Sequence, residues 1–66
     1  MLQKHSLTIH GHATSITLEP EFWEELKILA ETRKISLAAL VSEIDATRSD
    51  QNLCSALRVF VLKSLK

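Results

Sequence analysis

The chain has 66 residues, and its eight basic and eight acidic side chains cancel to a formal net charge of zero. So short a chain holds one domain, which buries only about 60% of the surface exposed by its unfolded form, so a lone copy is expected to be marginally stable. Cys54 is the only cysteine, which excludes an internal disulfide and a cysteine-rich zinc site and favours oligomerisation as the means of stabilisation.

Two short segments near the N-terminus alternate polar and apolar residues, which predicts strands at residues 6–10 and 13–18. The first segment could equally be a loose arm. Gly11-His12 between them fits the two-residue loop of a type II′ hairpin. In the second strand one face carries Thr14, Ile16 and Leu18, and the other carries Ala13, Ser15 and Thr17.

A first helix is predicted to begin at Glu19-Pro20-Glu21, because proline suits the first helical position and acidic residues in the first turn complement the helix dipole. It should end near Arg33-Lys34. Its apolar stripe consists of Phe22, Leu26, Leu29 and Ala30, with Trp23 beside them.

Two more helices follow. Ser36 is the expected cap of the second, and Asn52 of the third, after a polar connection at residues 47–51. The apolar residues at helical spacing are Leu37, Leu40, Val41 and Ile44 in the second helix, and Leu53, Ala56, Leu57, Phe60, Val61 and Leu65 in the third.

The strand at residues 13–18 needs a partner for its backbone N–H and C=O groups. With only this strand firmly predicted, the expected partner is the same strand of a second chain, antiparallel about a two-fold axis. This predicts an obligate homodimer. The apolar stripe of the third helix would be covered by the same dimer or by another protein.

The segment from Thr14 to Leu26 resembles the strand and first helix of ribbon-helix-helix proteins of the Arc/MetJ type. The resemblance implies a mainly α fold with a short β ribbon, an intertwined homodimer with an additional C-terminal helix. Residues 1–12 would be an arm or an extra strand, and residues 13–66 the domain. A narrower similarity, to short bacterial ribbon-helix-helix domain proteins, rests on Lys4-His5-Ser6, Gly11-His12, Leu18 to Trp23, Ile44-Asp45-Ala46, Asn52-Leu53 and Ser55 to Arg58.

The resemblance further implies DNA binding by the ribbon in the major groove. Carried over by position, the base-facing residues are Ala13, Ser15 and Thr17, although Ala13 stands where the family commonly has a long basic or polar residue. The start of the second helix would bind a phosphate through its N–H groups, with Arg33, Lys34, Ser36, Leu37 and Ala38. The dimer core would consist of Ile16, Leu18, Phe22, Trp23, Leu26, Leu40, Val41 and Ile44. The family often has glycine where this chain has Lys34-Ile35, which predicts a less tight turn.

No enzyme is expected, because no nucleophile has an evident base beside it and no phosphate-binding loop is present. His10 and His12 could share a metal ion, but no third ligand is evident, so neither a metal nor another cofactor is predicted. No apolar run reaches the roughly 20 residues of a membrane span, and residues 1–6 do not resemble a signal peptide. A cytoplasmic protein is therefore expected.

The leading hypothesis is a homodimeric transcriptional regulator that binds double-stranded DNA. The alternative is a dimeric protein-interaction module, antitoxin-like or an adaptor, that binds little or no DNA. The zero net charge, Ala13 and the acidic first helix favour the alternative, whereas Arg33 and Lys34 beside an open helix N-terminus favour DNA. A positive ribbon face would support DNA binding, and a neutral or negative face would support the alternative.

Overall fold

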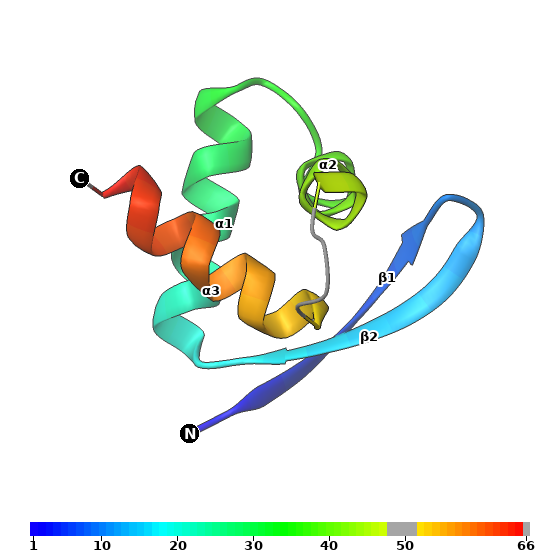
Figure 1. The fold of residues 1–66 in the computed structure, drawn as a ribbon, viewed down its shortest axis with the longest axis horizontal. Helices are drawn as coiled ribbons and strands as arrows, with labels where there is room; N and C mark the ends of the chain where they lie inside the picture. The colour runs from blue at the N-terminus through cyan, green and yellow to red at the C-terminus, as the bar shows by residue number, and fades with distance from the viewer. Residues whose placement is uncertain (48–51, 66) are drawn as a thin grey trace.

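A computed structural model describes residues 1–47 and 52–65. Three helices gather on one side of a two-stranded hairpin (Figure 1). Most of the predicted polar connection at residues 47–51 lies outside the described residues. The elements in chain order are β1 (Gln3–Ile9), β2 (His12–Leu18), α1 (Pro20–Thr32), α2 (Leu37–Thr47) and α3 (Leu53–Ser64).

The hairpin turns at His10-Gly11. Both residues have positive φ, 53° and 78°, which is the geometry of a type I′ turn, whose twist matches that of the flanking strands. Ile9 lies opposite His12 and closes the loop. The predicted type II′ loop at Gly11-His12 is therefore wrong by one residue, because His12 is already part of β2 and His10 takes the first left-handed position.

The partner of β2 is β1 of the same chain, in an antiparallel register that runs to Gln3 opposite Leu18. The homodimer is expected on the ground that only the strand at residues 13–18 is firmly predicted, and β1 removes that ground by pairing with β2. The pairing of two β2 strands stays a prediction. The polar–apolar alternation extends upstream of Ser6 to Gln3, so the N-terminal segment is a full strand and not a loose arm. Because β1 satisfies one edge of β2, the backbone of this strand does not by itself require a dimer.

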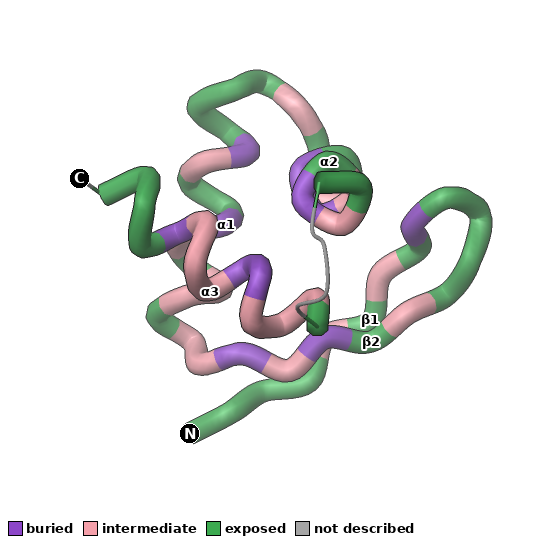
Figure 2. The backbone as a smooth tube through the Cα atoms, viewed as in Figure 1, coloured by how far each residue is buried: buried purple, intermediate pink, exposed green. Residues whose placement is uncertain are grey.

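The core of one chain lies between the inner face of the hairpin and the three helices (Figure 2). The apolar stripe of α3 faces this core, where α3 packs against α1, α2 and β2. Of the two coverings expected for α3, the same dimer and another protein, the second is therefore not needed, because its own chain covers the stripe. The buried residues are Ile9, Ile16, Leu18, Leu26, Ala30, Leu40, Val41, Ile44, Ala56, Leu57 and Val61.

Side-chain caps fix where α2 and α3 begin, as predicted. The Ser36 hydroxyl accepts a hydrogen bond from the Ala39 N–H at 3.0 Å, and the Asn52 side-chain oxygen accepts one from the Ser55 N–H at 2.8 Å. Each bond satisfies a backbone donor that has no partner inside the helix. Helix α1 begins differently, because Pro20 stands in its first turn and Glu19 makes no side-chain cap.

The turn between α1 and α2 is tight despite the absence of glycine. Lys34 has a φ of 59°, its N–H donates to the Glu31 carbonyl, and the Ile35 N–H donates to the Ala30 carbonyl, both at 3.0 Å. These two bonds form a Schellman motif, in which glycine is the usual left-handed residue. The expectation of a looser turn is wrong, because two backbone hydrogen bonds and the packing of Ile35 on the core hold Lys34 in the left-handed conformation.

Lys34→Gly is expected to raise the free energy of unfolding by about 1 kcal/mol. A side chain in the left-handed region costs about 1–2 kcal/mol, and the extra entropy that glycine loses on folding offsets only part of that gain. Urea denaturation of both proteins measures the difference. Thr32→Gly, two residues earlier at the last residue of α1, is the control and should destabilise the chain. A Lys34→Gly protein no more stable than the parent would contradict the strained turn.

Candidate nucleic-acid interface

The outward face of the hairpin holds the three predicted base-facing residues together. Ala13 and Ser15 are exposed and Thr17 is half-buried. Ile16 and Leu18, which flank Thr17 along the strand, are buried. This alternation follows from the period of two along a strand. The structure thus gives these residues the placement that the sequence pattern predicts, on the side of the hairpin away from the helices.

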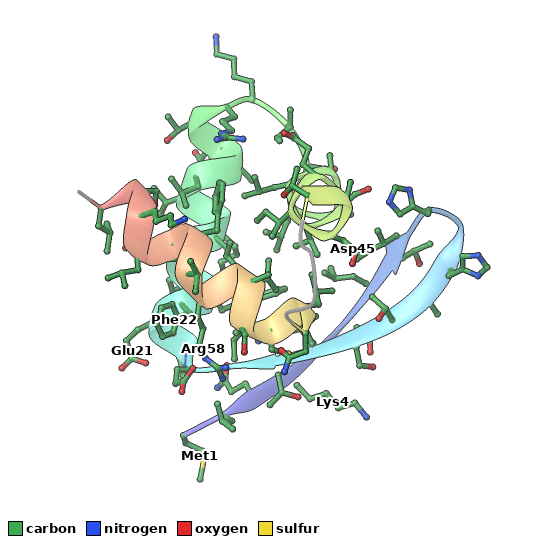
Figure 3. The ribbon with its side chains drawn as sticks, in the orientation of Figure 1. Met1, Lys4, Glu21, Phe22, Asp45 and Arg58 are labelled. Atoms are coloured by element: carbon green, nitrogen blue, oxygen red, sulfur yellow. The ribbon has the colours of Figure 1, made fainter. Side chains whose placement is uncertain are left out.

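Strand β1 contributes an equal share of this face. Lys4 lies opposite Thr17, Ser6 opposite Ser15, and Thr8 opposite Ala13, and directly opposed residues of an antiparallel pair point to the same side. All three β1 residues are exposed, and Figure 3 shows Lys4 extending away from the helices. We name this surface the ribbon face; its residues are Lys4, Ser6, Thr8, Ala13, Ser15 and Thr17.

The ribbon face is positive, though weakly. Neither strand contains an aspartate or a glutamate, and Lys4 is the one lysine or arginine in the two strands. The acidic side chains of the N-terminal half begin only at Glu19. Although the net charge of the whole chain is zero, the ribbon face therefore carries one cation and no anion.

The predicted phosphate-binding residues lie at the start of α2. Arg33, Lys34 and Ser36 are exposed, and Leu37 and Ala38 are half-buried. Arg33 is engaged within the chain, because its guanidinium lies 3.6 Å from a Glu43 carboxylate oxygen and 5.3 Å from the centre of the Phe60 ring. The connection between α1 and α2 lies at the end of α1 that is far from the hairpin (Figure 1). In one chain, this cluster and the ribbon face are therefore separate surfaces.

The residues predicted for a dimer core are already covered within one chain. Six of them are buried there, and Phe22 and Trp23 are half-buried against the same core. Contact with a second chain is not needed to remove them from water. The six buried residues are Ile16, Leu18, Leu26, Leu40, Val41 and Ile44.

Two histidine contacts tie the hairpin to the helices. The His5 ring stacks flat on Trp23, with ring centres 3.6 Å apart and planes 2° apart, and its buried Nε2 has no hydrogen-bond partner among the described residues. At the other end of the hairpin, His10 Nε2 lies 3.0 Å from the Ser42 hydroxyl of α2. Sequence reasoning missed both contacts. The alternation of β1, continued back to His5, would have placed His5 on the inner face.

An open groove of about 330 Å³ lies where the turn end of the hairpin meets α2 and α3. Its walls include Ala13, Thr14 and Ser15 of β2, with Asp45 of α2 and Leu53 of α3. Figure 3 shows Asp45 between α2 and the hairpin. His10 and His12 also line the groove, but within the described residues no three histidine, cysteine or acidic side chains cluster closely enough to hold a metal ion.

An ion pair joins the start of α1 to α3. Arg58 Nε donates to a Glu19 carboxylate oxygen at 3.0 Å, and Figure 3 labels Arg58 near the start of α1. A backbone hydrogen bond at Glu19, together with the bond from Arg58, holds the pKa of the Glu19 carboxyl below its usual range. The Arg58 side chain is thus engaged in an ion pair within the chain and is not part of the ribbon face.

The comparisons with known proteins agree with this architecture. The family model of the ribbon-helix-helix domain matches residues 2–65. Searches of curated proteins and of solved structures gave no match. None of the described helices has the length and apolar character needed to cross a membrane. With nearly its whole length matched, and an antiparallel two-stranded ribbon followed by three helices, this chain belongs to the ribbon-helix-helix domain family.

Proposed function

We propose that this protein is a transcriptional regulator that binds double-stranded DNA with its ribbon face in the major groove. Ribbon-helix-helix domains are non-enzymatic folds, and the family consists generally of DNA-binding transcriptional regulators and antitoxins. The observation that carries the proposal is the chemistry of the ribbon face, which has hydroxyl groups, one ammonium group and no carboxylate. This role would place the protein in the cytoplasm with the DNA.

We also propose that two copies bind together through the free edge of β2. Proteins of this family typically bind DNA as dimers. In a hairpin with a two-residue loop, the pair that flanks the loop is hydrogen-bonded and the pairs then alternate. Ala13, Ser15 and Thr17 therefore turn their backbone N–H and C=O groups away from β1. The groove beside Ala13 and Ser15 leaves this part of the edge accessible to a second strand.

In such a dimer the two β2 strands lie at the centre of a four-stranded sheet, and their outward side chains face the base edges. The Ser15 and Thr17 hydroxyls can donate or accept hydrogen bonds, so they suit several bases and discriminate weakly. Ala13 offers only an apolar contact, for example with a thymine methyl group. This composition supports a regulator with modest direct readout. The phosphate contact at the start of α2 stays a prediction.

The double variant Ser15→Glu/Thr17→Glu tests this function. It places four carboxylates per dimer on the surface proposed to face the phosphate-lined groove, and like charges brought together across an interface cost several kcal/mol. Affinity for a labelled random-sequence duplex at low ionic strength, measured by fluorescence anisotropy, should fall at least about 100-fold. Leu62→Glu/Ser64→Glu is the matched control, because it adds the same charge at two exposed positions of α3.

The control variant should bind DNA nearly as well as the parent, and circular dichroism should show both variants folded. Binding that survives the ribbon substitutions would rule out the ribbon face as the DNA surface. A parent protein that binds no duplex at low ionic strength would instead favour the protein-interaction module.

A further inference from the structure

The proposed function assigns base contacts to β2 and no particular contact to β1, yet half of the ribbon face belongs to β1. Lys4, Ser6 and Thr8 stand directly across from the proposed base-facing residues, and all three are exposed. Opposed side chains in an antiparallel pair lie about 4.5–5.5 Å apart at their Cβ atoms. The outward side chains of β1 therefore face the same binding partner as those of β2.

Lys4 also forms no ion pair with the part of the chain that the structure describes. Lys27, Arg33 and Arg58 each lie within 4.0 Å of a carboxylate oxygen. Lys4, like Lys34 and Lys63, makes no ion pair with any described residue, and it is the one of these three that lies on the ribbon face. Its ammonium group points away from the helices (Figure 3). A cation held on a face of hydroxyl groups, with no anion among them, complements a polyanion.

We propose that β1 is a phosphate-contacting strand, in which Lys4 binds a backbone phosphate of the DNA and Ser6 and Thr8 donate hydrogen bonds to neighbouring phosphates. This inference rests on the proposed function and on the pairing of two β2 strands. Neighbouring strands are about 4.8 Å apart, so the two β1 strands of the dimer lie roughly 14 Å from each other. The major groove is about 12 Å wide, which puts the two β2 strands over the bases and each β1 strand over a rim, where the phosphates run.

The placement divides the ribbon face by chemistry. Contacts with phosphates fix the position and orientation of a protein on the duplex without reading sequence, whereas contacts with base edges read it. The phosphate contact of Lys4 on β1 positions the protein on the duplex. The contacts of Ser15 and Thr17 on β2 with base edges provide the sequence readout. The strand that lies outside the minimal strand-helix-helix pattern thus compensates in part for the neutral Ala13, because it brings the cation that this position lacks.

The test is the salt dependence of DNA binding by Lys4→Gln. The logarithm of the binding constant falls with the logarithm of salt concentration with a slope of about −0.9 for each phosphate neutralised. A dimer carries two copies of Lys4, so the slope should become shallower by about 2. Affinity should fall equally for different duplex sequences. Lys4→Arg should keep the parental slope, because it keeps the charge. Lys27→Gln, at an exposed position of α1, is the control with the same loss of charge.

An unchanged slope for Lys4→Gln, while Ser15→Glu/Thr17→Glu still loses DNA binding, would overturn this inference and leave the proposed function standing. An equal change for Lys27→Gln would also overturn it, because the effect would then follow from net charge and not from the ribbon face. A parent protein without affinity for DNA would overturn both proposals together.

Discussion

Leu57→Ala should lower the free energy of unfolding by about 2–5 kcal/mol, the cost of truncating a fully buried leucine. Leu57 lies in α3 with 0% of its surface exposed, in a helix that contacts α1, α2 and β2 of the same chain. A domain of this size has a total stability of only about 3–10 kcal/mol. The substitution should therefore remove a large share of that stability, and urea denaturation followed by circular dichroism should show the loss as a lower transition midpoint.

Leu62→Ala is the matched control, because it removes the same atoms from the same helix at a position that is 55% exposed. Its effect should stay within about 0.5 kcal/mol, as for most surface substitutions. Similar losses for the two variants would contradict the packing of α3 on its own chain. A large loss for Leu62→Ala alone would mean that the opposite face of α3 is the covered one.

Ser15→Pro should convert the proposed dimer into a monomer that keeps its hairpin. The Ser15 N–H faces away from β1, so proline removes no hydrogen bond of the hairpin but deprives the free edge of β2 of a donor. Proline is tolerated on edge strands whose N–H faces solvent, and not inside a sheet. Light scattering after gel filtration, at several protein concentrations, should show dimers for the parent and monomers for the variant.

Ser6→Pro provides the matched comparison, because Ser6 is the cross-strand partner of Ser15 and its N–H also faces away from the hairpin. It lies on the outer edge of β1, so the dimer should persist. If Ser15→Pro remains dimeric while folded, the second chain does not join at β2. If the parent itself is monomeric at every concentration, the proposed dimer is wrong.

The sequence predicted the helices well, because the signals that define a helix are local. Ser36 and Asn52 form the caps expected of them, and Leu26, Leu40 and Leu57 lie buried on the stripes that helical spacing indicated. Each of these features depends on residues within about one turn of the chain. The inward and outward faces of β2 were predictable for the same reason.

The candidate site was only half predictable. The β2 side of the ribbon face followed from alternation. The β1 side required the knowledge that β1 pairs with β2 and begins at Gln3, whereas the predicted strand begins only at residue 6. The stack of His5 on Trp23 was not predictable at all, since it joins residues that are far apart along the chain and packed by the fold. The engagement of Arg33 by Glu43 is likewise a tertiary contact.

The sequence by itself determined where the helices lie, where their caps stand and which face of each element is apolar. Only the tertiary structure decided which strand pairs with β2 and what covers α3. The physical reason is that alternation and amphipathicity indicate which face of an element must be covered. The sequence pattern is the same whether the covering residues come from the same chain or from another. Here the chain itself covers the core face, through β1 and α3.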